Sequence, residues 1–134
     1  MNLMMLRSRL AGPARGFTLV ELLVVMAIIA LLLALAAPRY FKSVTRAEEA
    51  VLRENLTLVR DAIDKYYADT GKYPPDLEEL VKKRYLRKVP DDPIAGGAGA
   101  WIVVPPDNPE KGGVYDVRSG APGNSLAGTP YVEW

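Results

Sequence analysis

The chain has 134 residues, a formal net charge of +1, and neither cysteine nor histidine. This composition excludes disulfides, thiolate nucleophiles and cysteine-based metal sites, and it removes the commonest general base and metal ligand. The net charge gives no indication of nucleic-acid binding, and the sequence contains no nucleotide fingerprint. A catalytic site would have to rely on carboxylates, lysine or tyrosine, which do not cluster. The sequence therefore favours a non-enzymatic protein with one ordinary domain and an appendage.

The appendage begins with a short basic segment that is followed by a long apolar one. The apolar segment, residues 17–37, has about 21 residues, roughly what a hydrocarbon core of ~30 Å requires at ~1.5 Å per helical residue. A secretory signal would place a small-residue cleavage site after such a segment, whereas here the small residue, Gly16, precedes it. We therefore expect the apolar segment to survive processing as a membrane-spanning helix.

The basic residues around the apolar segment set the expected orientation. Three arginines precede the segment and favour a cytoplasmic N-terminus: Arg7, Arg9 and Arg15. Three further basic residues follow it and weaken this bias: Arg39, Lys42 and Arg46. The prediction is a single-pass membrane protein, with its N-terminus in the cytoplasm and its C-terminal head on the other side of the membrane.

Glu21 is the one acid within the apolar segment. A carboxylate in a membrane helix costs roughly 2.5–3.5 kcal/mol on insertion scales, so it needs a partner. Cleavage between Gly16 and Phe17 would create an α-amine at Phe17, one helical turn from Glu21. Within one subunit, the amine and the carboxylate could pair only in a strained geometry. Between staggered subunits, the amine of one subunit could neutralise the carboxylate of the next. The alternative is a plain signal anchor with an accidental glutamate.

The amphipathic continuation of this helix starts directly after Pro38. Proline removes one helical hydrogen bond and predicts a kink or a loosened turn, unless it ends the membrane helix outright. Helical spacing resumes at once, so we expect one helix from near Phe17 to about Asp69, stopped by Gly71. Its apolar stripe should pack on a small sheet: Leu52, Leu56, Val59, Ile63, Tyr66 and Tyr67.

The remaining chain predicts a short helix and a few strands. Asp76 is placed to cap the short helix, which ends in a basic cluster that is either solvated or a docking patch for an acidic partner: Lys82, Lys83, Arg84, Arg87 and Lys88. Beyond Val89 lie eight of the 11 glycines and seven of the 11 prolines, which disfavour helices. Three short strands are expected there: 101–104, 114–118 and 131–134. The predicted fold is α+β, with the long helix packed on a small antiparallel sheet of about three strands.

The N-terminal sequence "GFTLVELLVVMAIIALLLALAAP" resembles the leader and first helix of type IV pilin-like proteins. The matching residues are Gly16, Phe17, Thr18, Leu19, Glu21 and Leu22. The resemblance implies that a prepilin peptidase cuts between Gly16 and Phe17 and that Phe17 is then N-methylated. We expect Phe17, Glu21 and Pro38 to be the assembly residues. The implied domains are a leader at 1–16, a membrane and filament-core helix at 17–38, and a periplasmic head at 39–134.

The head carries a second resemblance, in "TGKYP", "VPDDP", "YDVRSGAPGN" and a terminal tryptophan. These motifs are similar in order and spacing to the major pseudopilins of type II secretion systems. The resemblance implies a structural subunit that polymerises through its N-terminal helix into a pseudopilus and drives protein export across the outer membrane. The implied partners are further copies of the chain, the prepilin peptidase, minor pseudopilins and the inner-membrane assembly platform.

Two other functions stay open at this stage. A type IV pilus subunit, for adhesion, motility or DNA uptake, would be favoured by a cysteine-closed loop or a strongly basic head. Removing Arg7, Arg9 and Arg15 from the 17 basic residues leaves 14, against 16 acids, and there is no cysteine. A membrane-anchored periplasmic enzyme is the third reading, and it would make the Gly16-Phe17 step accidental.

The resemblance also implies a calcium site in an acidic loop that follows a "D-x-x-S" pattern. Asp116 and Ser119 match that pattern, but the following stretch, "GAPGNSLAGTPYVEW", has no aspartate. Calcium takes six to eight oxygen ligands, several of them carboxylates. With Asn124, Ser125 and backbone carbonyls, these residues offer at most a weak site. We expect the loop to be held instead by packing, with Tyr131 and Trp134 covering the helix stripe.

Overall fold

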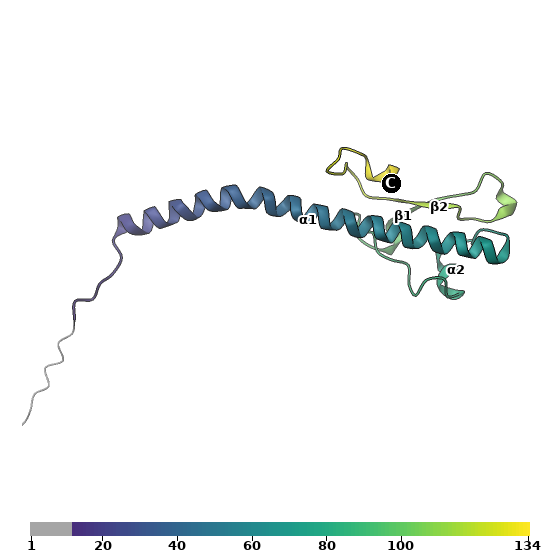
Figure 1. Cartoon of the computed structure of the whole chain (residues 1–134), viewed down its shortest axis with the longest axis horizontal. Helices are drawn as coiled ribbons and strands as arrows, with labels where there is room; N and C mark the ends of the chain where they lie inside the picture. The colour runs from purple at the N-terminus through teal and green to yellow at the C-terminus, as the bar shows by residue number, and fades with distance from the viewer. Residues whose placement is uncertain (1–11) are drawn as a thin grey trace, which may run out of the picture. The chain divides into compact units, whose positions relative to one another are not determined.

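The structure is a computed structural model, and it describes residues 12–134. Most of the predicted leader, residues 1–11, lies outside the described residues, as do Arg7 and Arg9. The helices are α1 (Leu19–Thr70) and α2 (Leu77–Lys82), and the strands are β1 (Trp101–Val104) and β2 (Asp116–Ser119) (Figure 1). Three single 3₁₀ turns complete the chain: η1 (Ala98–Ala100), η2 (Pro109–Lys111) and η3 (Tyr131–Glu133).

Helix α1 begins and ends at residues with clear capping roles. The Thr18 hydroxyl accepts a hydrogen bond from the backbone N–H of Glu21, at 3.2 Å, so the helix starts two residues later than predicted. At the other end Gly71 adopts a positive φ of 76°, and its N–H donates to the Tyr67 carbonyl at 2.8 Å. The predicted stop at Gly71 is confirmed.

Helix α1 is shared between two compact units of the chain. The helix continues through Pro38. One unit ends at this proline, and the other begins at Arg39. We call residues 39–134 the head. The head contains the hydrophobic core, whereas the described part of the other unit contributes no residue to it.

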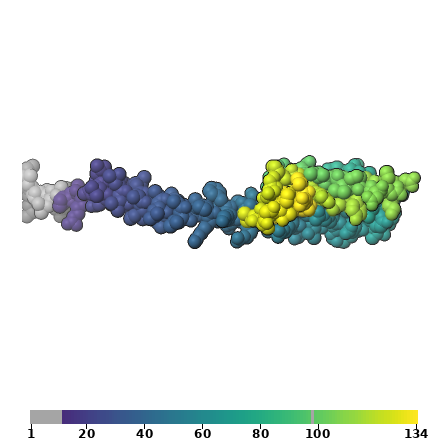
Figure 2. Space-filling view, turned by 90° about the horizontal axis from the view of Figure 1, so that it is seen from above, coloured from purple at the N-terminus to yellow at the C-terminus, as the bar shows by residue number. Residues whose placement is uncertain are grey.

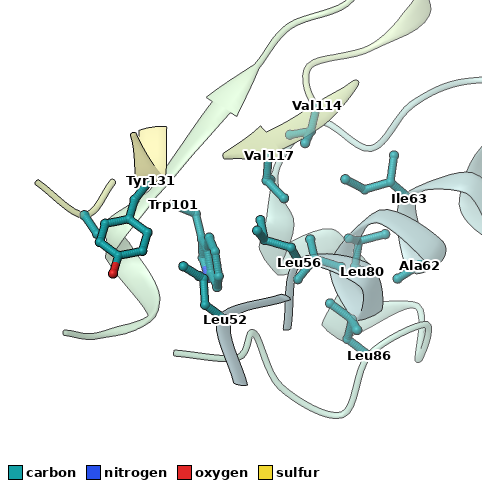
Figure 3. Close-up of a cluster of buried hydrophobic side chains, with 12 residues drawn as sticks. Leu52, Leu56, Ala62, Ile63, Leu80, Leu86, Trp101, Val114, Val117 and Tyr131 are labelled. Atoms are coloured by element: carbon teal, nitrogen blue, oxygen red, sulfur yellow. The ribbon is translucent and has the colours of Figure 1, made fainter. Parts of the chain in front are cut away.

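The core of the head forms around the predicted stripe of α1. Leu52, Val59 and Ile63 have no exposed surface, and Leu56 is 2% exposed. Figure 3 shows Leu52, Leu56 and Ile63 in one cluster with side chains of α2, β1 and β2: Leu80, Trp101 and Val117. Full burial of such an aliphatic side chain contributes about 1.5–3 kcal/mol. The expected role of the stripe, packing on a small sheet, is confirmed for these four residues. Tyr66 packs against the core, whereas Tyr67 stacks on Tyr73 instead.

Helix α2 and the segment before it close the end of the core. The Asp76 carboxylate accepts from the N–H of Glu79 at 2.8 Å, which confirms the predicted N-cap. The Pro74 carbonyl accepts from the N–H of Val114 at 2.9 Å, which joins this segment to the stretch before β2. Gly112 is required where the stretch before β2 passes close to the segment before α2, because a Cβ at this position would lie 2.2 Å from the Tyr73 carbonyl oxygen.

Strands β1 and β2 pair antiparallel, with Trp101 opposite Ser119 and Val104 opposite Asp116. The first predicted strand is confirmed in full. The second is shifted, to Asp116–Ser119 instead of 114–118. The N–H of Val114 bonds to the Pro74 carbonyl and not to a strand. The α+β fold, a long helix packed on a small antiparallel sheet, is confirmed.

The predicted third strand, residues 131–134, is wrong. This segment is the 3₁₀ turn η3, which packs beside β2. The N–H groups of Glu133 and Trp134 donate to the carbonyls of Pro130 and Tyr131, at 3.1 and 3.0 Å. These donors are used within the turn, so they are not available for a strand ladder. The C-terminal segment, yellow in Figure 2, instead covers part of the head through its side chains.

Candidate functional site

The N-terminal part of α1 exposes a continuous apolar surface. Its large apolar side chains, from Leu19 to Leu35, are 46–74% exposed. The helix is long and apolar enough to cross a membrane, and its most apolar window has no buried residue. Water solvates such a surface poorly, so this segment requires a bilayer or other helices around it.

The Gly16-Phe17 step precedes this helix. Both residues are exposed and lie outside any helix or strand, and Phe17 is 88% exposed. The cleavage and methylation predicted here stay predictions, but a peptidase could reach this backbone without unwinding α1.

Glu21 has a local role that the sequence analysis missed. Thr18 and Glu21 stand three residues apart at the start of α1, the spacing of a capping box. The Thr18 hydroxyl accepts a hydrogen bond from the backbone N–H of Glu21. In addition, an acidic side chain in the first turn interacts favourably with the helix dipole. The T-x-x-E pattern before an apolar run is the signal that could have indicated this role. Helix capping therefore competes with subunit pairing as the reason for the glutamate.

In the head, Glu49 forms the main polar junction between α1 and the C-terminal segment. This carboxylate is only 7% exposed, and one of its oxygens accepts both the N–H of Leu126 and the hydroxyl of Tyr131, each at 2.8 Å. Burial, and then the hydrogen bond to Glu49, raises the pKa of Tyr131 to about 12. The junction keeps the phenol protonated and holds the C-terminal segment against α1.

The sequence analysis did not single out Glu49. Its position, three residues before Leu52 on the buried face of α1, was the available signal. The predicted contribution of Tyr131 and Trp134 is confirmed, since Tyr131 belongs to the core and Trp134 packs against it. Arg53 of α1 also lies over the Trp134 ring, 4.5 Å from its centre.

Two of the candidate calcium ligands, Asp116 and Ser119, form hydrogen bonds with other side chains. The Asp116 carboxylate accepts from Arg60 Nε at 2.8 Å, and Arg60 also donates to the Val117 carbonyl at 2.9 Å. The Ser119 hydroxyl donates to the fully buried Asp92. Since side chains alternate along a strand, Asp116 and Ser119 point to opposite faces of β2.

Asn124 lies elsewhere, in an isolated backbone bridge with Pro130, and its side chain is exposed. Within residues 12–134, no three acidic side chains come together as a metal site would require. The structure therefore does not bring Asp116 and Ser119 together as ligands. The low calcium dependence expected from the sequence stays a prediction.

The basic cluster lies at the end of α2 and just after it. All five of its side chains are exposed, and none forms an ion pair with the described part of the chain. The cluster is therefore free to meet either solvent or an acidic surface.

Comparison with known proteins identifies a family model that matches the N-terminal segment. Residues 13–37 match the family model of the prokaryotic N-terminal methylation motif. This match covers the Gly16-Phe17 step, Glu21 and the exposed apolar part of α1. No solved structure matches the chain.

Relatives extend the comparison into the head. The type II secretion system core protein G of Escherichia coli K12 is 28% identical, over 88% of each chain. The core protein G of Dickeya chrysanthemi is 30% identical, over 81% of this chain and 77% of its own. The fimbrial protein EcpC of Eikenella corrodens is also 30% identical, over 84% of this chain and 72% of its own. The chain belongs to the type IV pilin-like proteins, in the group that includes the type II secretion system core protein G, the major pseudopilin.

Proposed function

We propose that this protein is a structural subunit of a type II secretion pseudopilus, processed at Gly16-Phe17 and methylated on Phe17. Residues 17–38 first anchor it in the inner membrane, with the head, residues 39–134, in the periplasm. The subunits then leave the bilayer and stack through their N-terminal helices. The growing pseudopilus drives protein export across the outer membrane.

The observation that carries this proposal is the contrast between the two parts of α1. The head side of the helix buries its stripe within its own chain, whereas the apolar side chains from Leu19 to Leu35 have no partner within the described residues. A bilayer satisfies that surface before assembly, and neighbouring helices satisfy it afterwards. A subunit that moves from membrane to filament needs a surface that fits both environments.

The protein is proposed to have no catalytic role. The relatives that carry the family assignment are core proteins of secretion systems by their names, and every buried polar side-chain atom among the described residues is hydrogen-bonded within the fold. The energy for assembly must then come from other proteins. Its proposed partners are further copies, the prepilin peptidase, minor pseudopilins and the inner-membrane assembly platform, and nucleic acid is not among them.

A type IV pilus subunit is the second candidate function. The similarity to the fimbrial protein EcpC supports it, at the same identity as the core protein G of D. chrysanthemi. Deleting the gene separates the two functions. Loss of protein export with normal adhesion, motility and DNA uptake supports the pseudopilin, and the reverse pattern supports the pilus subunit.

The direct test of the proposal is the mature N-terminus. Mass spectrometry of the membrane-held protein should find a chain that begins at an N-methylated Phe17. Gly16→Glu should abolish processing, since the peptidase requires a small residue before the cut. Gly12→Glu, four residues earlier in the leader, is the matched control and should be processed normally. A wild-type protein that still begins at Met1, in cells with an active prepilin peptidase, would refute the pilin-like function.

A further inference from the structure

Two open hollows on the head share two of their lining residues, Tyr73 and Tyr115. The first hollow has a volume of about 270 Å³, and side chains of α1 and β2 complete its lining: Arg60, Asp64 and Asp116. The second has a volume of about 150 Å³, and the loop between β1 and β2 completes its lining: Pro106, Asp107, Asn108 and Lys111. This loop and the C-terminal end of α1 lie at the same end of the head (Figure 1). We call the two hollows together the tyrosine groove.

Backbone hydrogen bonds and ring contacts hold the two tyrosines in place. The Tyr73 N–H donates to the Lys111 carbonyl at 2.6 Å, and the Tyr115 N–H donates to a carbonyl of β1 at 2.9 Å. The Tyr73 ring stacks on Tyr67 of α1 with 4.4 Å between the ring centres. It also meets the Tyr115 ring edge to face, at 5.3 Å. The groove is therefore formed before any ligand arrives, which lowers the entropy cost of binding.

The tyrosine groove presents hydrogen-bond donors that the head does not use. The buried Tyr131 hydroxyl donates to a carboxylate. By contrast, the hydroxyls of Tyr73 and Tyr115 and the amide nitrogen of Asn108 have no protein partner within residues 12–134. Desolvation, and then the neighbouring tyrosines and Asp64, raise the pKa of Tyr73, so its hydroxyl stays protonated as a donor. Free donors beside aromatic rings suit a ligand chain that has carbonyls but few N–H groups.

A proline-rich segment has this chemistry. Proline has no N–H, and the polyproline II helix has no internal hydrogen bonds, so its carbonyls stay available as acceptors. Aromatic-lined grooves take up such segments, whose preformed conformation loses little entropy on binding. One turn has three residues and rises about 9 Å, so successive turns of one segment can enter the two hollows.

The charges around the tyrosine groove favour a basic residue in the ligand. In the first hollow, Asp116 is paired with Arg60, so these two charges offset each other. Asp64 in the same hollow is exposed and forms no ion pair with the described part of the chain. In the second hollow, the acid Asp107 is accompanied by Lys111. The unbalanced charge is therefore Asp64, and a cation beside it would also meet the tyrosine rings.

We propose that the tyrosine groove binds a proline-rich segment of a partner protein, with a lysine or arginine of that segment beside Asp64. Proline rings of successive turns lie against Tyr73 and Tyr115. The two tyrosine hydroxyls and the Asn108 amide donate to carbonyls of the segment. This binding goes beyond the proposed function, because it requires only the folded head and joins it to a different protein.

A titration of the full-length chain in detergent micelles tests the proposal. The probe is a capped, fluorescein-labelled oligoproline peptide with a lysine at each end, and fluorescence anisotropy measures its binding. We expect a Kd below about 1 mM. The same peptide with glutamate at each end should bind at least about fivefold more weakly, because a glutamate would face Asp64. A glycine-serine peptide of the same length with lysine ends should show no measurable binding, because it lacks the preformed helix and the proline rings.

Variants of the tyrosine groove locate the binding site. Tyr115 is 53% exposed, so Tyr115→Ala should leave the head folded, as circular dichroism can check, and should lower the affinity by at least about tenfold. Tyr115→Phe keeps the ring and loses only the hydroxyl, so its loss of affinity should be smaller. Asp64→Asn should abolish the preference for lysine ends over glutamate ends. The matched controls are Tyr40→Ala and Glu54→Gln, which change exposed residues of α1 outside the groove and should leave the affinity unchanged.

The outcomes are separate from those that test the pseudopilin function. Absence of binding to the folded wild-type chain at millimolar peptide would overturn the proposal. Equal affinity for lysine-ended and glutamate-ended peptides, or unchanged affinity of Tyr115→Ala, would overturn it as well. Tyrosine rings beside carboxylates can also bind sugars, so an oligomer of N-acetylglucosamine is titrated in parallel. Binding of the sugar, lost in Tyr115→Ala, without binding of the peptide would assign the groove to glycans instead. Each of these results would leave the proposed pseudopilin function intact.

Discussion

The two units of the chain use the same helix in opposite ways. In the unit that ends at Pro38, the large apolar side chains of α1 are 46% exposed or more. In the head, Leu52, Val59 and Ile63 on the same helix are completely buried. The first unit depends on what surrounds it, whereas the head carries its own core. A change in the first unit should therefore affect assembly, and a change in the head core should affect stability.

The first prediction tests the assembly side of this contrast at Glu21. Glu21→Ala should be inserted and processed normally, because it is less polar than the wild type. The yield of pseudopili on overexpression, scored by electron microscopy and by sedimentation, should fall by an order of magnitude or more. The reason is that the amine of Phe17 in a neighbouring subunit loses its partner.

Glu21→Gln separates this pairing from helix capping. Glutamine suits a capping box as well as glutamate does, but it carries no charge. If charge pairing matters, Glu21→Gln should lose filaments as severely as Glu21→Ala. Full filament yield with Glu21→Gln would assign the residue to capping, and full yield with both variants would end any role in assembly.

The second prediction compares how much the buried and the exposed face of α1 contribute to the stability of the head. Leu56 is 2% exposed and Leu58 is 48% exposed, so the same substitution should have different effects. Leu56→Ala should lower the free energy of unfolding of residues 39–134 by about 2–5 kcal/mol, through lost burial and a residual cavity. Leu58→Ala should change it by no more than about 0.5 kcal/mol. Urea denaturation followed by circular dichroism measures both values.

Filament yield should rank these two variants differently from stability. Leu58→Ala should reduce the filament yield of the full-length chain although its head is stable, because the exposed Leu58 side chain is available for contacts with neighbouring subunits. Equal losses of stability for the two variants would contradict the assignment of separate faces. A normal filament yield for Leu58→Ala would leave the fold intact but count against a role of this exposed face in assembly.

The third prediction concerns Glu49, the polar junction of the head. Glu49→Ala should lower the free energy of unfolding by about 1–3 kcal/mol, because it leaves the buried Tyr131 hydroxyl and the partly buried Leu126 N–H without an acceptor. Glu48→Ala, the neighbouring exposed acid, is the control and should change it by no more than about 0.5 kcal/mol. Indistinguishable effects of the two variants would show that the junction does not stabilise the head.

Glu49 also shows where prediction from the sequence ends. The buried stripe, the stop at Gly71 and the Asp76 cap could be predicted because each depends on neighbours within a few residues. The partners of Glu49 lie 77 and 82 residues away in the sequence, so no local pattern indicates them. The wrong third strand has the same cause. Tyr131 suits a strand by propensity, but its pairing with Glu49 and its burial against α1 place it in a 3₁₀ turn.

The fourth prediction, with the smallest effect, concerns calcium. Ligand binding stabilises a fold by an amount that grows with RT ln(1 + [L]/Kd), so a weak site contributes little at millimolar calcium. In the head, the Asp116 carboxylate is already paired with Arg60, and the Ser119 hydroxyl is bonded to Asp92. A calcium ion at Asp116 would have to compete with the positive charge of Arg60, and the following loop supplies no further aspartate. Thermal unfolding of residues 39–134 should therefore shift by only a degree or two between millimolar calcium and excess chelator. Arg60→Gln frees Asp116 and should enlarge the shift if that ion pair is what excludes the metal. A loss of ten degrees or more on chelation of the wild type would show that Asp116 and backbone carbonyls form a real site, and that the C-terminal segment depends on a metal as well as on Glu49.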